Sequence, residues 1–360
     1  MARERAFLVI VEPPGKPSGF LRESYEEMKE LTLSAGGEIV GALEARVERP
    51  SPSHYIREGK LGEVSQKVKE NRAQLVIFNI DLTPGQARNL EEDVGVRAVD
   101  RTGLILDIFS RRAVSREGKL QVEVAQLNYL LPRLVGHGTL LSRLGGGIGT
   151  RGPGEQKLEV DRRRLRERIS RLKGELERLG QHRALVRKGR RRKDFSTVAI
   201  VGYTNAGKST LLNALTGARA FVEDKLFATL DPMTRLSRRN GERGILFTDT
   251  VGFLRELPHG LIEAFHSTLE EVTDADCLIH VLDASSPYRE EQKTSVEGVL
   301  AELHAGERPL ILALNKCDLM TEDEKGPLRE RFPDAVLISG RERTGLDELH
   351  EALLRRIKNG

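Results

Sequence analysis

The sequence is poor in the residues that mark several classes of protein. Of its 360 residues none is Trp, 4% are aromatic and two are Cys. So few aromatic rings argue against base stacking as the main way of holding a nucleic acid. The two thiols, Cys277 and Cys317, lack the spacing of metal ligands, so we interpret them as reduced, inert residues of a cytoplasmic protein.

Long apolar runs are also missing. The run Phe7–Val11 is far shorter than the roughly 20 residues that a membrane helix needs, and no basic stretch followed by an apolar one opens the chain. We therefore expect neither a membrane span nor export. Hydrophobic residues make up 38% of the chain, which is enough for the cores of two or three domains.

The modest net charge of +4 conceals a basic block. Residues 161–193 hold fifteen Lys or Arg against four Asp or Glu, a net +11, so the remainder carries −7. Such a block is typical of a surface that binds a polyanion, and it is also compatible with a solvated helix face. The candidate anion contacts in it are Arg162, Arg163, Arg164, Arg166 and Arg168.

The spacing of apolar residues divides the chain into three parts. Short apolar runs at 5–11, 38–43 and 75–80 alternate with helical spacing, which predicts a small parallel α/β domain. Two leucine stripes then predict an antiparallel helical hairpin. The stripes are Leu120, Val124, Leu127, Leu131 and Leu134, and Leu165, Ile169, Leu172, Leu176 and Leu179. We place the domains at 1–115, 116–193 and 194–360.

A glycine-rich segment connects the two stripes. It contains Gly147-x-Gly149-x-x-Gly152, which resembles a dinucleotide-binding turn, but such a turn must follow a strand directly and open a helix on the same sheet. Here leucine-rich helical sequence precedes it and Pro153 follows. Six glycines in residues 144–154 suit either a flexible connector or a binding tip for an irregular partner, with Arg151 as a candidate RNA contact.

A second glycine loop lies where phosphate chemistry requires it. The stretch FSTVAIVGYTNAGKSTLLNAL reads as a strand, the pattern Gly202-x-x-x-x-Gly207-Lys208-Ser209, and an amphipathic helix. Backbone N–H groups of such a loop cradle phosphate oxygens. Lys208 is expected to neutralise the β and γ phosphates, and Ser209 to bind Mg²⁺.

Three later motifs follow in the order of a nucleotide-binding α/β sheet. GILFTDTVG ends a strand at Asp249, suited to the Mg²⁺ shell, and reaches Gly252, whose N–H can meet a γ phosphate. Between the loop and this strand, Thr229 has a hydroxyl for Mg²⁺ and an N–H for the γ phosphate. The strand PLILALNKCD then delivers Asn315–Asp318 at its carboxyl end.

The last motif selects the base. An ionised Asp318 accepts hydrogen bonds from the ring N–H and exocyclic amine of guanine, whereas adenine would leave this carboxylate unpaired at a cost of roughly 1–3 kcal/mol or more. Asn315 is expected to serve the base and tie loops together, the Lys316 stem to lie along the ring, and the backbone near Ser339 to meet the guanine carbonyl. The predicted nucleotide residues are Gly202, Tyr203, Thr204, Asn205, Ala206, Gly207, Lys208, Ser209, Thr210, Phe227, Ala228, Thr229, Leu230, Asp231, Asp249, Thr250, Val251, Gly252, Asn315, Lys316, Cys317, Asp318, Ile338, Ser339 and Gly340.

Residues 197–340 resemble a translation-factor-type GTPase domain, a mostly parallel sheet with helices on both faces, and the whole chain resembles the HflX family of ribosome-associated GTPases. The resemblance is carried by FATLDPMTR, by DTVGFLRELPHGLIEAFHSTLEEV and by GGGIGTRGPGEQKLEVDRRRLRERI, with weaker agreement in YIREGKLGEV and LILDIFSRRA.

This resemblance implies GTP binding and Mg²⁺-dependent hydrolysis, with Lys208, Thr229 and Gly252 in catalysis. It also implies docking on the large ribosomal subunit, and some members are credited with splitting ribosomes under stress. The basic hairpin would then meet rRNA phosphates. We expect a monomer when free. Two alternatives stay open: a nucleotide-gated RNA-binding or scaffold protein with negligible turnover, and a GTPase acting on tRNA or ribosome assembly.

The sequence departs from common GTPase patterns at several points. Phe253 stands where many GTPases place the glutamine that orients the attacking water, so a partner is expected to stimulate hydrolysis. Asn205 is either a ligand for K⁺, as in several GTPases without that glutamine, or a brace for its loop. Gly340 replaces a common Ala, and the sequence ends after the helical stretch 346–357, without the C-terminal domain of longer family members.

Overall fold

The computed structural model of the chain describes residues 3–16, 19–134, 153–191, 195–217, 226–227, 229–237, 244–255 and 266–359. The chain forms two units, each discontinuous in sequence. The first contains Met1–Arg111 and Lys119–Leu176, and the second contains Arg112–Gly118 and Glu177–Gly360. None of the helices in these described ranges is both long enough and apolar enough to cross a bilayer.

The first unit is built on a parallel sheet with strand order β2-β1-β3-β4. Its central strand β1 is buried on both faces, which explains why it reads as a continuous apolar run rather than an alternating one. The strands are β1 (Arg5–Glu12), β2 (Glu38–Arg46), β3 (Leu75–Phe78) and β4 (Arg97–Val99), and the helices between and after them are α1 (Phe20–Ser34), α2 (Glu58–Glu70), α3 (Pro84–Val94) and α4 (Arg101–Arg112).

Helices cover this sheet in the manner of an α/β fold. On one face Phe7 and Val9 of β1 pack with Val64 of α2 and Leu90 of α3 in a single hydrophobic cluster. Leu8, the alternate residue of β1, points to the opposite face, which α1 helps to cover. The predicted alternation of strands and helices over this part of the chain therefore forms a parallel sheet. The ends of β1, β2 and β3 lie within three residues of the predicted runs, whereas β4 was not predicted.

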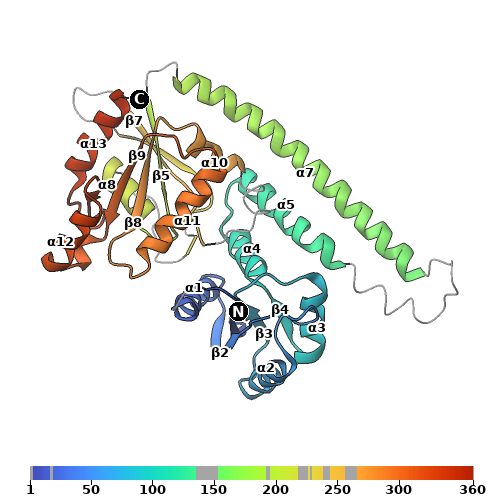
Figure 1. The fold of residues 1–360 in the computed structure, drawn as a ribbon. Coiled ribbons are helices and arrows are strands. Elements are labelled where there is room, and N and C mark those ends of the chain that lie inside the picture. Colours follow the sequence, from blue (N-terminus) through green and yellow to red (C-terminus); the bar gives the residue numbers. More distant parts are fainter. Residues whose placement is uncertain are drawn as a thin grey trace. The chain divides into compact units, whose positions relative to one another are not determined.

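Two long helices follow, α5 (Arg116–Arg133) and α7 (Pro153–Arg191), and they run side by side (Figure 1). Pro153 opens α7, where a missing N–H costs nothing because the first turn has no partner for it. Val124 of α5 and Ile169 and Leu172 of α7, all from the predicted stripes, are buried. The glycine-rich tip, Gly147 to Gly152 with Arg151, lies outside the described residues.

The second unit is a six-stranded sheet with order β10-β9-β8-β5-β7-β6, in which β6 is antiparallel to β7 and the other pairs are parallel. The strands are β5 (Ser196–Gly202), β6 (Met233–Ser237), β7 (Ile245–Asp249), β8 (Cys277–Asp283), β9 (Leu310–Asn315) and β10 (Val336–Leu337). The helices are α8 (Lys208–Thr216), α10 (His266–Thr273), α11 (Arg289–Glu302), α12 (Glu322–Arg331) and α13 (Leu346–Asn359), with the 3-10 turn η2 (Cys317–Leu319).

Helices lie on both faces of this sheet (Figure 1). Leu211 of α8 and Leu349 of α13 share one core with Ile200 of β5 and Ile279 of β8, while α10 and α11 pack against β5 and β8 from the other side. The predicted α/β class, with a mostly parallel sheet, is confirmed. The parallel strands β5, β7 and β9 end at the same edge, which brings their terminal residues together.

Candidate nucleotide site

The loop between β5 and α8 has a backbone that only particular residues tolerate. Gly202 has φ +154° and Gly207 has φ +95°, and a Cβ built at either would clash, with the Val281 carbonyl oxygen and with Asn315 Nδ2 respectively. Asn205 between them has φ +61°, the left-handed region in which Asn is more common than most residues. The glycines of the predicted phosphate loop are therefore required by the turn itself.

Lys208 begins α8 and points back over this loop. Its Nζ donates to the carbonyl oxygens of Tyr203 at 2.8 Å and Gly202 at 3.2 Å. Burial lowers the pKa of Lys208 to about 8, an effect that the nearby Asp249 charge opposes. The side chain is thus held in place by neutral carbonyls, so an anion arriving at the loop need not compete with a carboxylate bonded to Nζ.

Three oxygen-bearing side chains from different segments converge beside Lys208. Ser209 Oγ lies 2.6 Å from Asp249 Oδ2 and 2.9 Å from Thr229 Oγ1, and Thr229 Oγ1 lies 3.0 Å from the same carboxylate oxygen. Burial raises the pKa of Asp249, while Lys208 and the two hydroxyls lower it. Asp249 Oδ1 is buried without a hydrogen-bond partner in the described part of the chain. Two hydroxyls and a carboxylate with an unused oxygen suit a hard cation such as Mg²⁺.

The segment after β7 closes against the phosphate loop. Phe253 pairs with Tyr203 in a parallel bridge, with Phe253 N donating to Gly202 O at 3.1 Å and Thr204 N to Phe253 O at 2.8 Å. A Cβ at Gly252 would lie 2.8 Å from Thr204 Cγ2 and 2.9 Å from Lys208 Nζ, so glycine is needed there. The phenyl ring of Phe253 is buried and packs into the interior.

At the other end of the site, Asn315 ties two loops together. Its Nδ2 donates to Ala206 O of the phosphate loop at 2.8 Å, and its Oδ1 accepts from Gly340 N at 3.0 Å. Lys316 Nζ lies 2.7 Å from Asp283, and the carboxylate-bearing Asp318 is exposed at the start of η2. The sequence predicted the loop-tying role of Asn315, but not the contact with Asp283.

The other predicted residues differ in where they lie and in what they contact. Ala228 and Arg151 lie outside the described residues. The Asp231 carboxylate accepts hydrogen bonds from Val114 N at 3.0 Å and Ser115 N at 2.8 Å, contacts far from it in sequence. Gly340 is tightly placed, because a Cβ there would lie 3.3 Å from Leu211 N. Thr204 Oγ1, within the loop, is buried without a partner among the described residues.

The basic block of α7 is mostly solvent-facing. Arg163, Arg164 and Arg166 are exposed, and the first two form weak pairs within the helix, with Glu167 at 3.6 Å and Asp161 at 3.8 Å. Arg168 instead bonds Glu123 of α5, with its Nη2 2.7 Å from Oε1, and Arg162 is half-buried. Of the five predicted anion contacts, Arg163, Arg164 and Arg166 are therefore the ones open to a partner.

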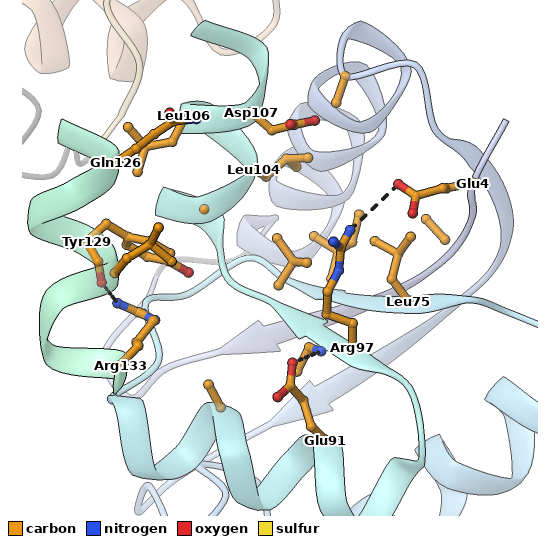
Figure 2. Close-up of a pocket in the computed structure, with 18 of the residues that line it drawn as sticks. Glu4, Leu75, Glu91, Arg97, Leu104, Leu106, Asp107, Gln126, Tyr129 and Arg133 are labelled. Carbon is orange, nitrogen blue, oxygen red and sulfur yellow. Dashed lines mark hydrogen bonds and ion pairs between the residues drawn. The ribbon is translucent and has the colours of Figure 1, made fainter. Parts of the chain in front are cut away.

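The first unit contains a cavity of about 1050 Å³ that the sequence did not predict (Figure 2). Apolar side chains such as Leu75 and Leu104 form part of its wall. Its charged side chains are paired within the chain: Arg97 lies 3.6 Å from Glu4 and Arg111 lies 3.0 Å from Asp107.

A buried carboxylate, Asp100, anchors the end of α5 beside this cavity. It accepts from Tyr129 Oη at 2.7 Å and Arg133 Nη2 at 2.6 Å, and the guanidinium stacks 3.6 Å from the Tyr129 ring centre. Burial raises the pKa of Asp100, while the Tyr129 hydroxyl and the Arg133 charge oppose the rise. Figure 2 shows Tyr129 and Arg133 side by side on α5.

The fold and the site define a P-loop GTPase, and comparison with known proteins leads to a family. Three family models match consecutive parts of the chain: "GTP-binding GTPase N-terminal" over 22–110, "GTP-binding GTPase Middle Region" over 112–190 and "50S ribosome-binding GTPase" over 197–316. The GTPase HflX of Caldanaerobacter subterraneus subsp. tengcongensis is 53% identical over 356 residues, which cover 99% of this chain and 81% of that protein.

Further relatives agree. The GTPase HflX of Escherichia coli is 44% identical over 337 residues, covering 93% of this chain and 79% of that protein. A crystal structure of SsGBP in complex with GDP is 26% identical with a TM-score of 0.51, covering 99% of each chain. The chain belongs to the HflX family of GTPases. It binds guanine nucleotides and hydrolyses GTP.

Proposed function

We propose that this GTPase is a cytoplasmic switch that docks on the large ribosomal subunit in a nucleotide-dependent manner. The observation that carries the proposal is the match of residues 197–316 to a family described as 50S ribosome-binding GTPases. The exposed arginines of α7 support it, because rRNA phosphates attract such a surface through counterion release. Separation of ribosomal subunits under stress is the physiological role that we infer from the family resemblance.

The chemistry would be performed by the residues that converge at the edge of the second sheet. Ser209, Thr229 and Asp249 would hold Mg²⁺, which when bound neutralises the growing charge on the phosphates. Lys208 would bind the β and γ phosphates from its position over the loop, and the Gly252 N–H would meet the γ phosphate. Because Thr229 belongs to a separate loop, its engagement would depend on the triphosphate.

The chain's own residues offer no group to orient the attacking water at the position after Gly252. Phe253 is buried and pairs through its backbone with Tyr203, and its apolar ring cannot form a hydrogen bond to orient a water molecule. Asn205 in the phosphate loop would instead hold K⁺ near the bridging phosphate oxygens, where charge develops in the transition state. A ribosomal partner would supply what remains of the stimulation.

Co-sedimentation with separated ribosomal subunits tests the docking proposal. We expect the chain to pellet with the large subunit in a non-hydrolysable GTP analogue and to remain in the supernatant in GDP. The control is the Asp318→Asn variant in the same guanine nucleotides, which should lose the response. Equal binding in both nucleotides, or binding to neither subunit, would contradict the proposal and favour a tRNA or ribosome-assembly substrate.

A further inference from the structure

A contact between Asp231 and the start of helix α5 connects the Thr229 loop to a distant part of the chain. Asp231 Oδ2 accepts hydrogen bonds from Val114 N and Ser115 N, and the Ser115 hydroxyl donates to Oδ1. Ser115 Oγ in turn accepts from Gly118 N at 2.8 Å, which is the bond of a helix N-cap. All these residues belong to the second unit.

This contact suits a carboxylate. The first turn of a helix has unsatisfied N–H groups and a partial positive charge, so an anion there is stabilised by both. The contact is partly buried, which limits the screening of its charge by water. A Cβ at Gly118 would clash with Asp231 Oδ1, so glycine at this helical position makes room for the carboxylate.

Asp231 is two residues from Thr229, whose hydroxyl lies over the predicted Mg²⁺ site. Leu230 between them is buried, as is Phe227 on the other side. Two residues span at most about 7 Å of extended chain, so fixing the Asp231 carboxylate restricts where the Thr229 hydroxyl can move. The loop is therefore held at Thr229 by the site and at Asp231 by α5.

We propose that Asp231 is a positioning residue: it fastens the Thr229 loop to the N-terminus of α5 and thereby couples the order of that helix turn to the presence of the γ phosphate. The proposal rests on the proposed role of Thr229 in sensing that phosphate. Coupling of this kind is reciprocal, so whatever holds the start of α5 also favours GTP over GDP. The N–H groups that bind Asp231 belong to Val114 and Ser115, directly before the first residue of α5, Arg116.

The test measures, for the full chain, the ratio of affinities for a GTP analogue and GDP. Ser115→Ala and Gly118→Ala should each lower this preference about 5-fold or more, while leaving GDP affinity unchanged. Gly118→Ala is the more specific variant. Alanine forms helices more readily than glycine, so a loss of the preference would come from the clash of the new Cβ with the Asp231 carboxylate and not from a weakened helix. The Ser115→Ala/Asp231→Ala double variant should lower the preference no more than Asp231→Ala alone, because the Ser115 hydroxyl acts through a bond to the carboxylate that Asp231→Ala already removes.

Hydrogen exchange supplies a second readout. In the parent chain the amides at 114–118 should exchange more slowly with the GTP analogue than with GDP, and this difference should vanish in Gly118→Ala. Thr83→Ala is the matched control, because it removes the N-cap of α3 in the other unit and should change neither readout. An equal effect of Thr83→Ala, or independent effects of Ser115→Ala and Asp231→Ala, would overturn the proposal.

Thr229→Ala distinguishes the proposed switch role of Thr229 from the proposed coupling through Asp231. If it abolishes the preference for the GTP analogue while Ser115→Ala and Gly118→Ala preserve it, the coupling through Asp231 is wrong and the switch role of Thr229 stands. If Thr229→Ala preserves the preference, the proposed function of the loop is itself wrong, and with it the coupling.

Discussion

At the scale of single residues, Asp318 carries the choice of base. It lies exposed at the start of η2, where nothing in the described chain hides it from an incoming guanine. Asp318→Asn should lower guanine nucleotide affinity about tenfold or more and raise that for xanthine nucleotides, which present a carbonyl where guanine has its amine. Titration with GDP and XDP checks this. The exposed Asp323→Asn is the control, and an unchanged guanine preference in Asp318→Asn would contradict the assignment.

Substitution of Asn205 tests whether the chain uses K⁺, and the backbone conformation at this residue decides which variant is the most informative. Because the φ of Asn205 is +61°, Asn205→Gly removes the side chain without straining the backbone. Asn205→Ala removes the side chain too, but it places a Cβ in a backbone conformation that alanine rarely adopts. Turnover should be faster in KCl than in NaCl or choline chloride at equal ionic strength, because K⁺ would stabilise charge in the transition state. Both variants should lose this difference. If the K⁺ effect survives in Asn205→Gly, Asn205 only braces the loop.

His280 on β8 makes stability depend on pH. Burial lowers the pKa of His280 from 6.5 to about 3, with the charges of Lys293 and Lys208 acting in the same direction. The folded state therefore excludes a proton that the unfolded chain accepts: the free energy of unfolding is unaffected by His280 above pH 6.5 and falls by about 1.4 kcal/mol per pH unit from 6.5 towards 3.

Urea unfolding at several pH values measures this effect. His280→Leu should flatten the loss of stability between pH 6.5 and 5 relative to the parent chain, because the proton-binding group of the unfolded state is gone. His304→Asn, at an exposed histidine in the left-handed region, should leave the profile unchanged. Parallel profiles for the parent and His280→Leu would show that His280 is protonated in the folded state.

At the scale of elements, three of the exposed arginines of α7 should contribute to the salt dependence of RNA binding. Each phosphate that they neutralise contributes about 0.7–0.9 to the slope of log affinity against log salt. Reversing all three to Glu should therefore lower the slope by about two and weaken binding. The targets are Arg163, Arg164 and Arg166, and the control is the same charge change on exposed residues of the first unit, Lys67, Lys69 and Arg72. A slope that changes equally in both variants would assign the α7 block to a solvated face.

Elements with short-range patterns were predictable. The phosphate loop is contiguous, and its glycines follow from the turn, so the residues from Gly202 to Ser209 are in the order that the site needs. The stripes of α5 and α7 predicted a hairpin because apolar residues recur at helical spacing. The contact of Asp231 with Ser115 joins residues 116 positions apart, and no local pattern indicates such a pair. The cavity of the first unit likewise depends on how helices pack, which the sequence does not state.

At the scale of the whole molecule, turnover should depend on a partner. With Phe253 buried at the position of the water-orienting residue, we expect slow hydrolysis by the free chain. Ribosomes should accelerate it, with partner-supplied groups in other GTPases contributing about 10³–10⁵ in rate. Multiple-turnover assays with and without large subunits measure this, with small subunits as the control. Fast hydrolysis by the chain alone would contradict it.

The discontinuity of the second unit affects how the GTPase can be divided. Residues 112–118, which include the first three residues of α5, belong to this unit although residues 119–176, of the first unit, separate them from the rest of it in sequence. A fragment cut at the predicted boundary, residue 194, would retain every nucleotide motif and lose Ser115, the partner that Asp231 holds. Its Thr229 loop would then have one attachment instead of two. A truncated GTPase domain would thus lack a restraint on the Thr229 loop that the same residues have in the intact chain. A minimal fragment that preserves the switch must supply residues 112–118 as a separate peptide or by circular permutation.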